Sequence, residues 1–351
     1  MRENIFSLFI FFALFLLVSC HKDNPVIPSG RAVILSIDRD TLSVGDTLRL
    51  SGEFLGTPNK NLYLMLDSMV KVESHNCIVW NNNEIQFVIP NGSKSGMIRY
   101  VSEDDAIDSI EVGINPVPYL EIIEIPAGTY IRGSNLSSLN EQPATEVTIS
   151  NPFLMSKYEI TQRMYKAVTG TNPSRVTGIE LPVENVTWIN AVQFCNELSK
   201  LNGLEEVYTI TGVDAVADFS KNGWRLPTEA EWEYACKAGT NGDFAGSGII
   251  GEMAWYGDNS GLKMHPPGRK NPNQFGLYDM HGNVWEWCWD YYDPDYYSEG
   301  MTIDPVGPSN GERRVLRGGS WNDGMNFLRS SNRTLPANII GNNGIRPVRI
   351  K

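Results

Sequence analysis

Hydrophobic and polar residues follow three different rhythms along the chain. The first stretch, Ile5 to Val18, is almost wholly apolar. From residue 32 to residue 112, short runs alternate apolar and polar positions, which is the period of half-buried strands. Beyond residue 120, helix-like spacing occurs among short strands and long irregular stretches. The pattern therefore predicts a leader segment followed by two domains of different type.

Alternation is clearest in five runs of the first domain. Strands are predicted at residues 32–37, 47–52, 84–89, 95–101 and 109–112. Turn residues such as Val44-Gly45-Asp46 separate these runs, and strands at this spacing favour an antiparallel sandwich. His75 and Cys77 lie near each other in this region, but two groups do not make a metal site.

Helix signals mark the second domain. One apolar stripe has steps of four, four and three residues: Trp188, Val192, Cys195 and Leu198. Thr187 is placed to cap this helix. Another helix is predicted over residues 158–169, with Thr161 as its cap.

A capping box predicts the third helix, because Thr228 is followed three residues later by Glu231. Gly239 stands where a glycine at the C-terminal end is expected. Cys195 and Cys236 are predicted to lie on helices in the core. A disulfide between them is the alternative in an oxidising compartment.

Composition narrows the class of protein. The chain has 351 residues and is 41% hydrophobic, which suits two domains with real cores and excludes global disorder. Its 32 glycines and 20 prolines favour a loop-rich fold. The net charge is −12, with no cluster of lysine and arginine, which argues against a nucleic-acid partner.

The apolar leader is too short to span a bilayer, which needs about 20 residues, and it fits a secretory signal. Its end, Leu17-Val18-Ser19-Cys20, resembles a bacterial lipobox. The resemblance implies a signal peptide at residues 1–19, a lipid on Cys20 and a polar linker at residues 20–30. The protein would then be a cell-envelope lipoprotein held at the membrane by that lipid, facing either the periplasm or the outside. An ordinary signal peptide that contains a cysteine is the alternative.

Three phrases of the first domain are VGDTLRLSGEFLG, NNNEIQFVIPNGSKSGMIRYV and a final IEV. They resemble the immunoglobulin-like IPT/TIG family over residues 31–114. The resemblance implies a spacer or docking module. Pro116-Val117-Pro118 marks its boundary.

The second domain contains IPAGTYIRGS, KYEITQRMYKAV, LPVENVTW, WRLPTEAEWEYACKAG, NQFGLYDMHGNVWEWCWD, RRVLRGGSWN and GIRPVR. In this order the motifs resemble the formylglycine-generating enzyme, or sulfatase-modifying factor, superfamily over residues 120–351. The resemblance implies a loop-rich α+β domain related to C-type lectins. The predicted fold class is thus multidomain: an all-β immunoglobulin-like sandwich, then a loop-rich α+β domain like formylglycine-generating enzyme.

The family enzyme oxidises a cysteine of its substrate, using oxygen and copper held by two cysteines that follow a GGS(W/Y) motif. Gly318-Gly319-Ser320-Trp321 is intact here, but the first cysteine position falls on Asp323 and the second on or beside Leu328. Soft thiolates select Cu(I), so neither copper nor oxidase activity is expected. No catalytic residue is assigned.

The resemblance implies a remodelled cleft, lined by Trp285, Ser320, Trp321 and Asp323. Its polarity would have changed from soft to acidic, so it could accept a polar or cationic group. Under this reading Arg329, Arg333 and Arg346 tie loops together through multiple hydrogen bonds.

Trp285, Trp287 and Trp289 occupy alternate positions, which on a strand would line one face. Glu286, Cys288 and Asp290 would then lie on the other. Trp287 and Trp289 are predicted to be core residues. Trp285 stays open between core and cleft.

Asp279, Gly282, Val284 and Glu286 match a calcium site of the family. The set mixes carboxylates with backbone carbonyls, the hard oxygen donors that calcium prefers. The alternative is that Asp279 and Glu286 pair with backbone N–H groups or arginines. A second family calcium site would fall near residues 253–259.

Two functions remain open. The favoured one is a lipid-anchored binding or structural protein, with glycans or other envelope proteins as ligands. The other is an enzyme that modifies an exported protein or cofactor with non-standard residues, including non-haem metal chemistry. A facial triad needs two histidines and a carboxylate, and the spacing of His265 and His281 gives it no support. Exposed aromatic residues would favour binding, whereas a buried acid–base or metal cluster would favour catalysis.

Overall fold

The computed structural model describes residues 32–351, apart from 39–40, 54, 56–61, 67–69, 74–75, 91–92, 94, 103–104, 116–119, 300 and 336–340. The predicted signal peptide with Cys20, the linker, His75 and the boundary Pro116-Val117-Pro118 lie outside the described residues. Within the described part, no helix is both long and apolar enough to cross a bilayer.

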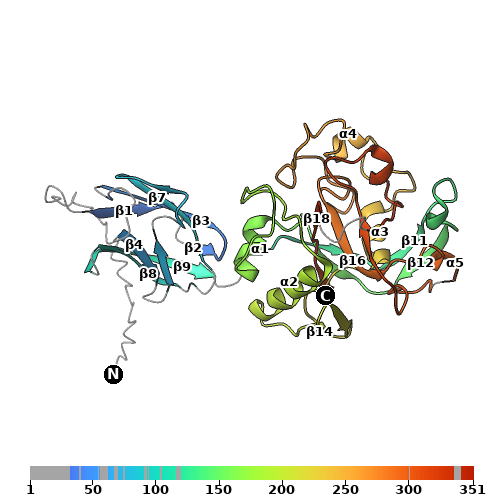
Figure 1. Cartoon of the computed structure of the whole chain (residues 1–351), viewed down its shortest axis with the longest axis horizontal. Helices are drawn as coiled ribbons and strands as arrows, with labels where there is room; N and C mark the ends of the chain where they lie inside the picture. The colour runs from blue at the N-terminus through green and yellow to red at the C-terminus, as the bar shows by residue number, and fades with distance from the viewer. Residues whose placement is uncertain are drawn as a thin grey trace, which may run out of the picture.

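Two β-sheets form the first unit (Figure 1). One has the strand order β1-β3-β7-β6 and the other β2-β9-β8-β4-β5. The strands are β1 (Val33–Ile37), β2 (Thr41–Ser43), β3 (Thr47–Glu53), β4 (Leu62–Leu66), β5 (Val70–Glu73), β6 (Val79–Trp80), β7 (Glu84–Val88), β8 (Gly96–Ser102) and β9 (Asp105–Asn115). Leu48 and Phe87 from one sheet and Leu64 and Ile98 from the other are fully buried in one hydrophobic cluster. This unit is therefore a β-sandwich.

All five predicted strands are present in the sandwich, as β1, β3, β7, β8 and β9. The sequence analysis missed β2, β4, β5 and β6, which are short or lack clear alternation. The expectation of purely antiparallel pairing was wrong in one place, because β2 runs parallel to β9. The IPT/TIG resemblance stays a prediction.

The second unit is built from small sheets and long connections (Figure 1). Its three-stranded sheets are β10 (Ile122–Ile125), β13 (Phe153–Ser156) and β19 (Val348–Ile350), and β17 (Arg314–Arg317), β16 (Trp285–Tyr291) and β18 (Asn343–Gly344). Its hairpins are β11 (Gly128–Arg132) with β12 (Thr145–Ile149), and β14 (Tyr208–Thr211) with β15 (Asp214–Ala217). Its helices are α1 (Gln162–Thr169), α2 (Trp188–Leu201), α3 (Glu229–Lys237), α4 (Ile250–Met253) and α5 (Tyr296–Glu299), with 3₁₀ turns η2 (Leu139–Glu141) and η3 (Met325–Leu328). The predicted loop-rich α+β character is confirmed.

The predicted helix caps are confirmed. Thr187 accepts a hydrogen bond from the Asn190 N–H at the start of α2. Thr228 and Glu231 form the capping box of α3. The helix predicted over residues 158–169 begins later, at Gln162, because its cap Thr161 has extended backbone angles and leaves the residues before it outside the helix.

The glycine predicted after α3 is confirmed. The helix ends at Lys237 with Ala238 as its C-cap, so Gly239 is the first residue beyond the cap, with a positive φ of 84°. Ala238 also adopts the left-handed conformation, with a φ of 46°.

Strand β16 separates two hydrophobic clusters. Trp287 is buried in the cluster around α2, and Trp285 and Trp289 are partly buried against the same cluster. Cys288 lies in the other cluster, around α3. The alternating pattern thus predicted the two faces correctly.

Two of the predicted core cysteines lie in these separate clusters, Cys195 with α2 and Cys236 with α3. Both are buried and neither forms a disulfide. The structure therefore confirms the prediction of unpaired core cysteines and not the alternative of a disulfide between them.

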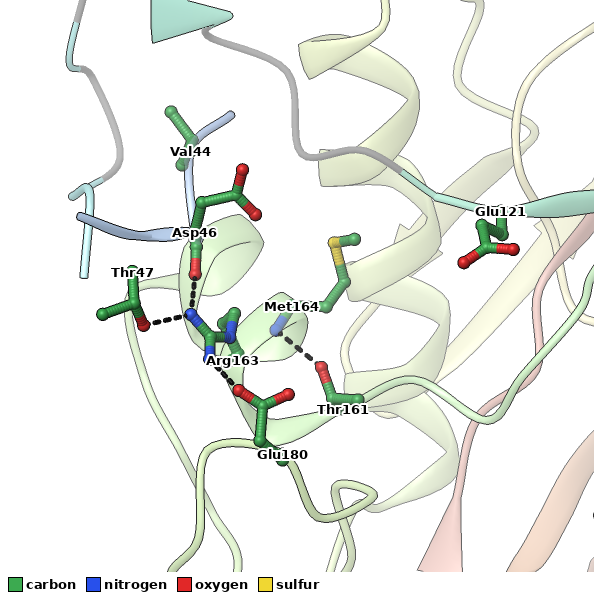
Figure 2. A pocket seen from close by; sticks show the side chains of 9 residues that line it. Val44, Asp46, Thr47, Glu121, Thr161, Arg163, Met164 and Glu180 are labelled. Atoms are coloured by element: carbon green, nitrogen blue, oxygen red, sulfur yellow. Dashed lines mark hydrogen bonds and ion pairs between the residues drawn. The ribbon is translucent and has the colours of Figure 1, made fainter. Parts of the chain in front are cut away.

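Helix α1 contacts the sandwich through Arg163. The Arg163 Nη1 donates to Gly45 O at 3.0 Å and to Thr47 Oγ1 at 2.6 Å, and its Nη2 pairs with Glu180. Figure 2 shows the guanidinium between Thr47 and Glu180, at a pocket of about 390 Å³. Ala167, one turn further along α1, packs into the core of the sandwich. The two units therefore share a contact that is both polar and apolar.

We expect the contact between Arg163 and Thr47 to have a measurable coupling energy. Thr47→Val and Arg163→Met should each lower the free energy of unfolding, and the double variant should lose less than the sum. The expected coupling is about 1 kcal/mol, the usual net value of one such hydrogen bond. A double-mutant cycle from denaturant unfolding measures it. Thr209→Val, at an exposed position of β14, is the matched control, and its effect should be additive with that of Arg163→Met. Additive effects of Thr47→Val and Arg163→Met would contradict the assigned contact.

Candidate functional site

Three of the four residues predicted for the cleft are joined by hydrogen bonds. The Asp323 Oδ2 accepts from the Trp285 indole Nε1 at 2.9 Å and from the Ser320 backbone N at 2.9 Å. The Ser320 hydroxyl donates to the same oxygen. We call Trp285, Ser320 and Asp323 the Asp323 cluster.

Trp321, the fourth predicted residue, has no side-chain hydrogen bond to the cluster. Its backbone N donates to Asn283 O at 2.9 Å, and its indole N–H is buried without a hydrogen-bond partner. Trp321 therefore helps to hold the loop through its backbone hydrogen bond, and its side chain is not part of the hydrogen-bonded group.

The GGSW segment turns sharply to place Ser320. Gly318 and Gly319 have φ values of 95° and 79°, in the left-handed region that favours glycine. A Cβ on Gly319 would lie 2.8 Å from Leu328 Cδ1. Leu328 is fully buried against this turn. The second copper-ligand position of the family, expected on or beside Leu328, thus falls at an apolar core residue or next to it.

The border of the Asp323 cluster is apolar and exposed. Phe327 and Met325, both on η3, have exposed fractions of 49% and 46%. The Phe327 ring lies edge-on to Trp285, with 6.5 Å between the ring centroids. This border thus has the exposed aromatic residues set out for binding, whereas the feature set out for catalysis, buried ionisable groups with shifted pKa values, occurs at Glu159 and Asp279.

The remaining thiols of the domain are buried and disfavour the thiolate form. Cys195, Cys236 and Cys288 are fully buried. Burial raises the pKa of Cys236 to about 12 and raises the pKa of Cys288 well above its usual value. Because the thiolate is the copper ligand, these side chains are no substitute for the missing pair.

The two carboxylates of the predicted calcium site lie in different environments. The Glu286 carboxylate is paired with Arg346, with Oε1 2.7 Å from Nη2, and its Oε2 accepts from the Trp232 Nε1 at 2.6 Å. Glu286 is therefore paired with an arginine, which is the alternative to calcium binding given in the sequence analysis. The Asp279 Oδ2 accepts from the Gly268 N at 2.6 Å, whereas its Oδ1 is buried and has no hydrogen-bond partner.

Glu159 is a third carboxylate at this site, and the sequence analysis missed it. Its Oε1 accepts from the Val284 N at 3.0 Å and its Oε2 from the Asn283 Nδ2 at 2.6 Å. Burial, and then repulsion from Asp279 and Glu286, raise its pKa well above the usual value. Burial likewise raises the pKa of Asp279 to about 6. The one sequence feature that could have pointed to Glu159 is its position within the family motif KYEITQRMYKAV.

Metal chemistry based on histidine has no support in the geometry. The His281 Nε2 accepts from the Ala245 N at 3.0 Å, its Nδ1 lies 2.6 Å from Leu328 O, and burial lowers its pKa to about 4. His265 stacks on Trp255, with 3.8 Å between the centroids. Over the described ranges, no three His, Cys, Asp or Glu side chains are arranged to hold a metal ion.

The three arginines expected to tie loops together do so. Arg329 pairs with Glu141, Arg333 with Glu229 and Arg346 with Glu286, at 2.6–2.7 Å. Arg317, which the sequence analysis did not single out, pairs with Glu233, and all of these carboxylates are buried.

Residues 111–351 match the model of the sulfatase-modifying factor enzyme 1-like domain. The match covers more than half of the chain, so the chain belongs to this family. It is 34% identical to a chaperone protein, LppX, of Paenibacillus barcinonensis, over 62% of this chain and 87% of that protein. It is 42% identical to a formylglycine-generating enzyme of Streptomyces coelicolor, over 31% of this chain and 39% of the enzyme.

Among solved structures, the chain is similar to Treponema denticola variable protein 1. The TM-score is 0.60 with 34% sequence identity, over 66% of this chain and 95% of the other. The fold of the second unit is therefore shared by enzymes and by proteins of other names, so the fold by itself does not assign an activity.

Proposed function

We propose that this protein is a lipid-anchored envelope protein whose sulfatase-modifying-factor domain binds a partner instead of oxidising one. The observation that carries the proposal is the hydrogen-bonded Asp323 at the first copper-ligand position. A carboxylate that already accepts three hydrogen bonds is a hard oxygen donor, which is a poor ligand for Cu(I). The second position is expected on or beside Leu328, whose side chain offers no donor atom.

An exported or envelope polypeptide is the partner that we favour. The exposed Phe327 and Met325 beside Trp285 provide apolar contact area of the kind that protein interfaces use. The similarity to a protein named as a chaperone supports a role in assembly or folding of other proteins. Glycans are the other ligand class, for which the surface offers the same aromatic side chains.

Calcium is proposed as a structural ion of the same domain. The buried, unpartnered Asp279 Oδ1 is an oxygen that a cation would satisfy, and the carbonyls of Gly282 and Val284 are the other candidate ligands. Glu286 would not be a calcium ligand, because both of its carboxylate oxygens already accept hydrogen bonds from Arg346 and Trp232. It would act on the site only through its ion pair with Arg346. The ion would supply charge that balances Glu159 and Asp279.

The full chain, incubated with copper, oxygen and a cysteine-containing sulfatase-type peptide, should form no aldehyde above background. Mass spectrometry of the peptide measures the product. Asp323→Cys combined with Leu328→Cys is the matched variant, and it should gain Cu(I) binding that the wild type lacks, because both thiol positions are then restored. Aldehyde formed by the wild-type chain would contradict the proposal.

Removing calcium should destabilise the wild-type protein. An ion that binds only the folded state, at a hundred times its Kd, adds about 2.7 kcal/mol to the free energy of unfolding. A chelator should therefore lower the Tm of the wild type and leave that of Asp279→Ala nearly unchanged. Glu205→Gln, at an exposed carboxylate outside both regions matched to family calcium sites, is the control and should respond like the wild type. Identical melting of the wild-type protein with and without chelator would argue against the site.

Cys20→Ala should release the protein from the membrane fraction and abolish its labelling by a fatty-acid probe, because the lipid is the proposed anchor. Cell fractionation with detergent partitioning measures this. Cys77→Ala, at a half-buried thiol of the sandwich, is the control and should stay in the membrane. If the Cys20→Ala protein still partitioned into the detergent phase, the proposal of a lipid anchor at Cys20 would be wrong.

A further inference from the structure

The Asp323 carboxylate is held in one orientation by the loop that carries it. All three of its hydrogen bonds fall on Oδ2. Ser320, which supplies two of them, is fully buried, and its hydroxyl also lies 2.7 Å from Asn322 Oδ1. Asn342 in turn donates to Asn322 Oδ1 at 2.8 Å. A ligand that binds the carboxylate therefore meets a group that has little rotational freedom left to lose.

The other oxygen of this carboxylate, Oδ1, is available. Within the described part of the chain it accepts no hydrogen bond, and Asp323 belongs to no ion pair there. The residue is half-buried, so that oxygen is not sealed in the core. The contrast is with Glu141, Glu229 and Glu286, each of which is paired with an arginine. Asp323 is thus a fixed negative charge for which the described residues supply no cation.

One aromatic side chain contacts this charge, and a second aromatic side chain contacts the first. Trp285 binds the carboxylate through its indole N–H, and Phe327 stands edge-on to that ring. Phe327 and Met325 expose about half of their surface. Aromatic rings attract cations through their negative faces. Apolar neighbours also accommodate the methylene stem of a lysine or an arginine.

We propose that the Asp323 cluster, with Phe327 and Met325, binds a lysine or arginine side chain of a partner polypeptide. The inference rests on the proposed binding function and names its partner by chemistry. A single carboxylate with aromatic neighbours suits an organic cation, whereas a calcium ion would need several oxygen ligands. The net charge of −12 favours the approach of a cationic partner.

The test uses two blocked peptides, Gly-Gly-Lys-Gly-Gly and the same peptide with norleucine in place of lysine. They have the same aliphatic stem and differ by the ammonium group. Binding to the full chain is followed by the NMR signal of the Trp285 indole N–H, which reports on the hydrogen bond to Asp323. The lysine peptide should bind at least about fivefold more tightly, as expected for a favourable charge and cation–π contact, and the preference should shrink with added salt.

Asp323→Asn is the informative variant, because an amide oxygen can still accept from Trp285 and Ser320 while the charge is lost. It should abolish the preference for lysine. Glu205→Gln removes one exposed carboxylate that has no contact with the Asp323 cluster, and it should keep that preference. This control separates a local effect from net charge. Phe327→Leu should weaken lysine binding about two- to fivefold through loss of the ring.

Equal binding of both peptides, no binding of either, or a preference that survives in Asp323→Asn would overturn the inference. The aldehyde assay separates this failure from that of the proposed function. An absence of both aldehyde and lysine preference would reject only the cationic partner. Aldehyde formation would reject the binding function itself.

Discussion

Buried pairs between arginines and carboxylates are the constraint on which the second unit depends. A domain with few long strands and helices leaves many backbone carbonyls without a ladder partner, and buried carbonyls need donors. Arg346 supplies such donors to Ser156 O, Lys157 O and Tyr278 O while it holds Glu286. The planar fork of an arginine suits this double task, which a lysine would perform less well.

These pairs also explain why the domain keeps one arrangement of its loops. Arg333 joins Glu229 on α3 to the carbonyls of Asn140 and Asp293, which lie in distant loops. Removing one partner of a buried pair leaves an uncompensated charge, at a cost of about 3–5 kcal/mol. Alternative loop arrangements would break several such pairs at once. The fixed frame is what allows a half-buried group such as Asp323 to be held in place.

The parts of the fold that the sequence predicted are those with local signals. The caps at Thr187 and Thr228 and the alternation of Trp285, Trp287 and Trp289 act within a few residues, so they were readable. The partners of the arginines were not, because Glu141 and Arg329 are 188 residues apart. Glu159 was missed for the same reason, since its bonds to Asn283 and Val284 cross more than a hundred residues. In the first unit, β2 could not be read, because its parallel pairing with β9 depends on a strand some seventy residues away.

At the candidate site too, the sequence identified the residues but not the contacts between them. Alignment of the GGSW segment located Asp323 and Leu328, but the hydrogen bond from Trp285 to Asp323 joins two segments 38 residues apart. That bond decides the chemistry. A carboxylate left free at this position could rotate and bind many partners weakly, whereas one held through Oδ2 has few orientations left for Oδ1. In the proposed function, a hard anion in place of a soft thiolate would no longer hold Cu(I) and would be matched by a cationic side chain. Both parts of that proposal rest on the same residue, Asp323, in the same frame.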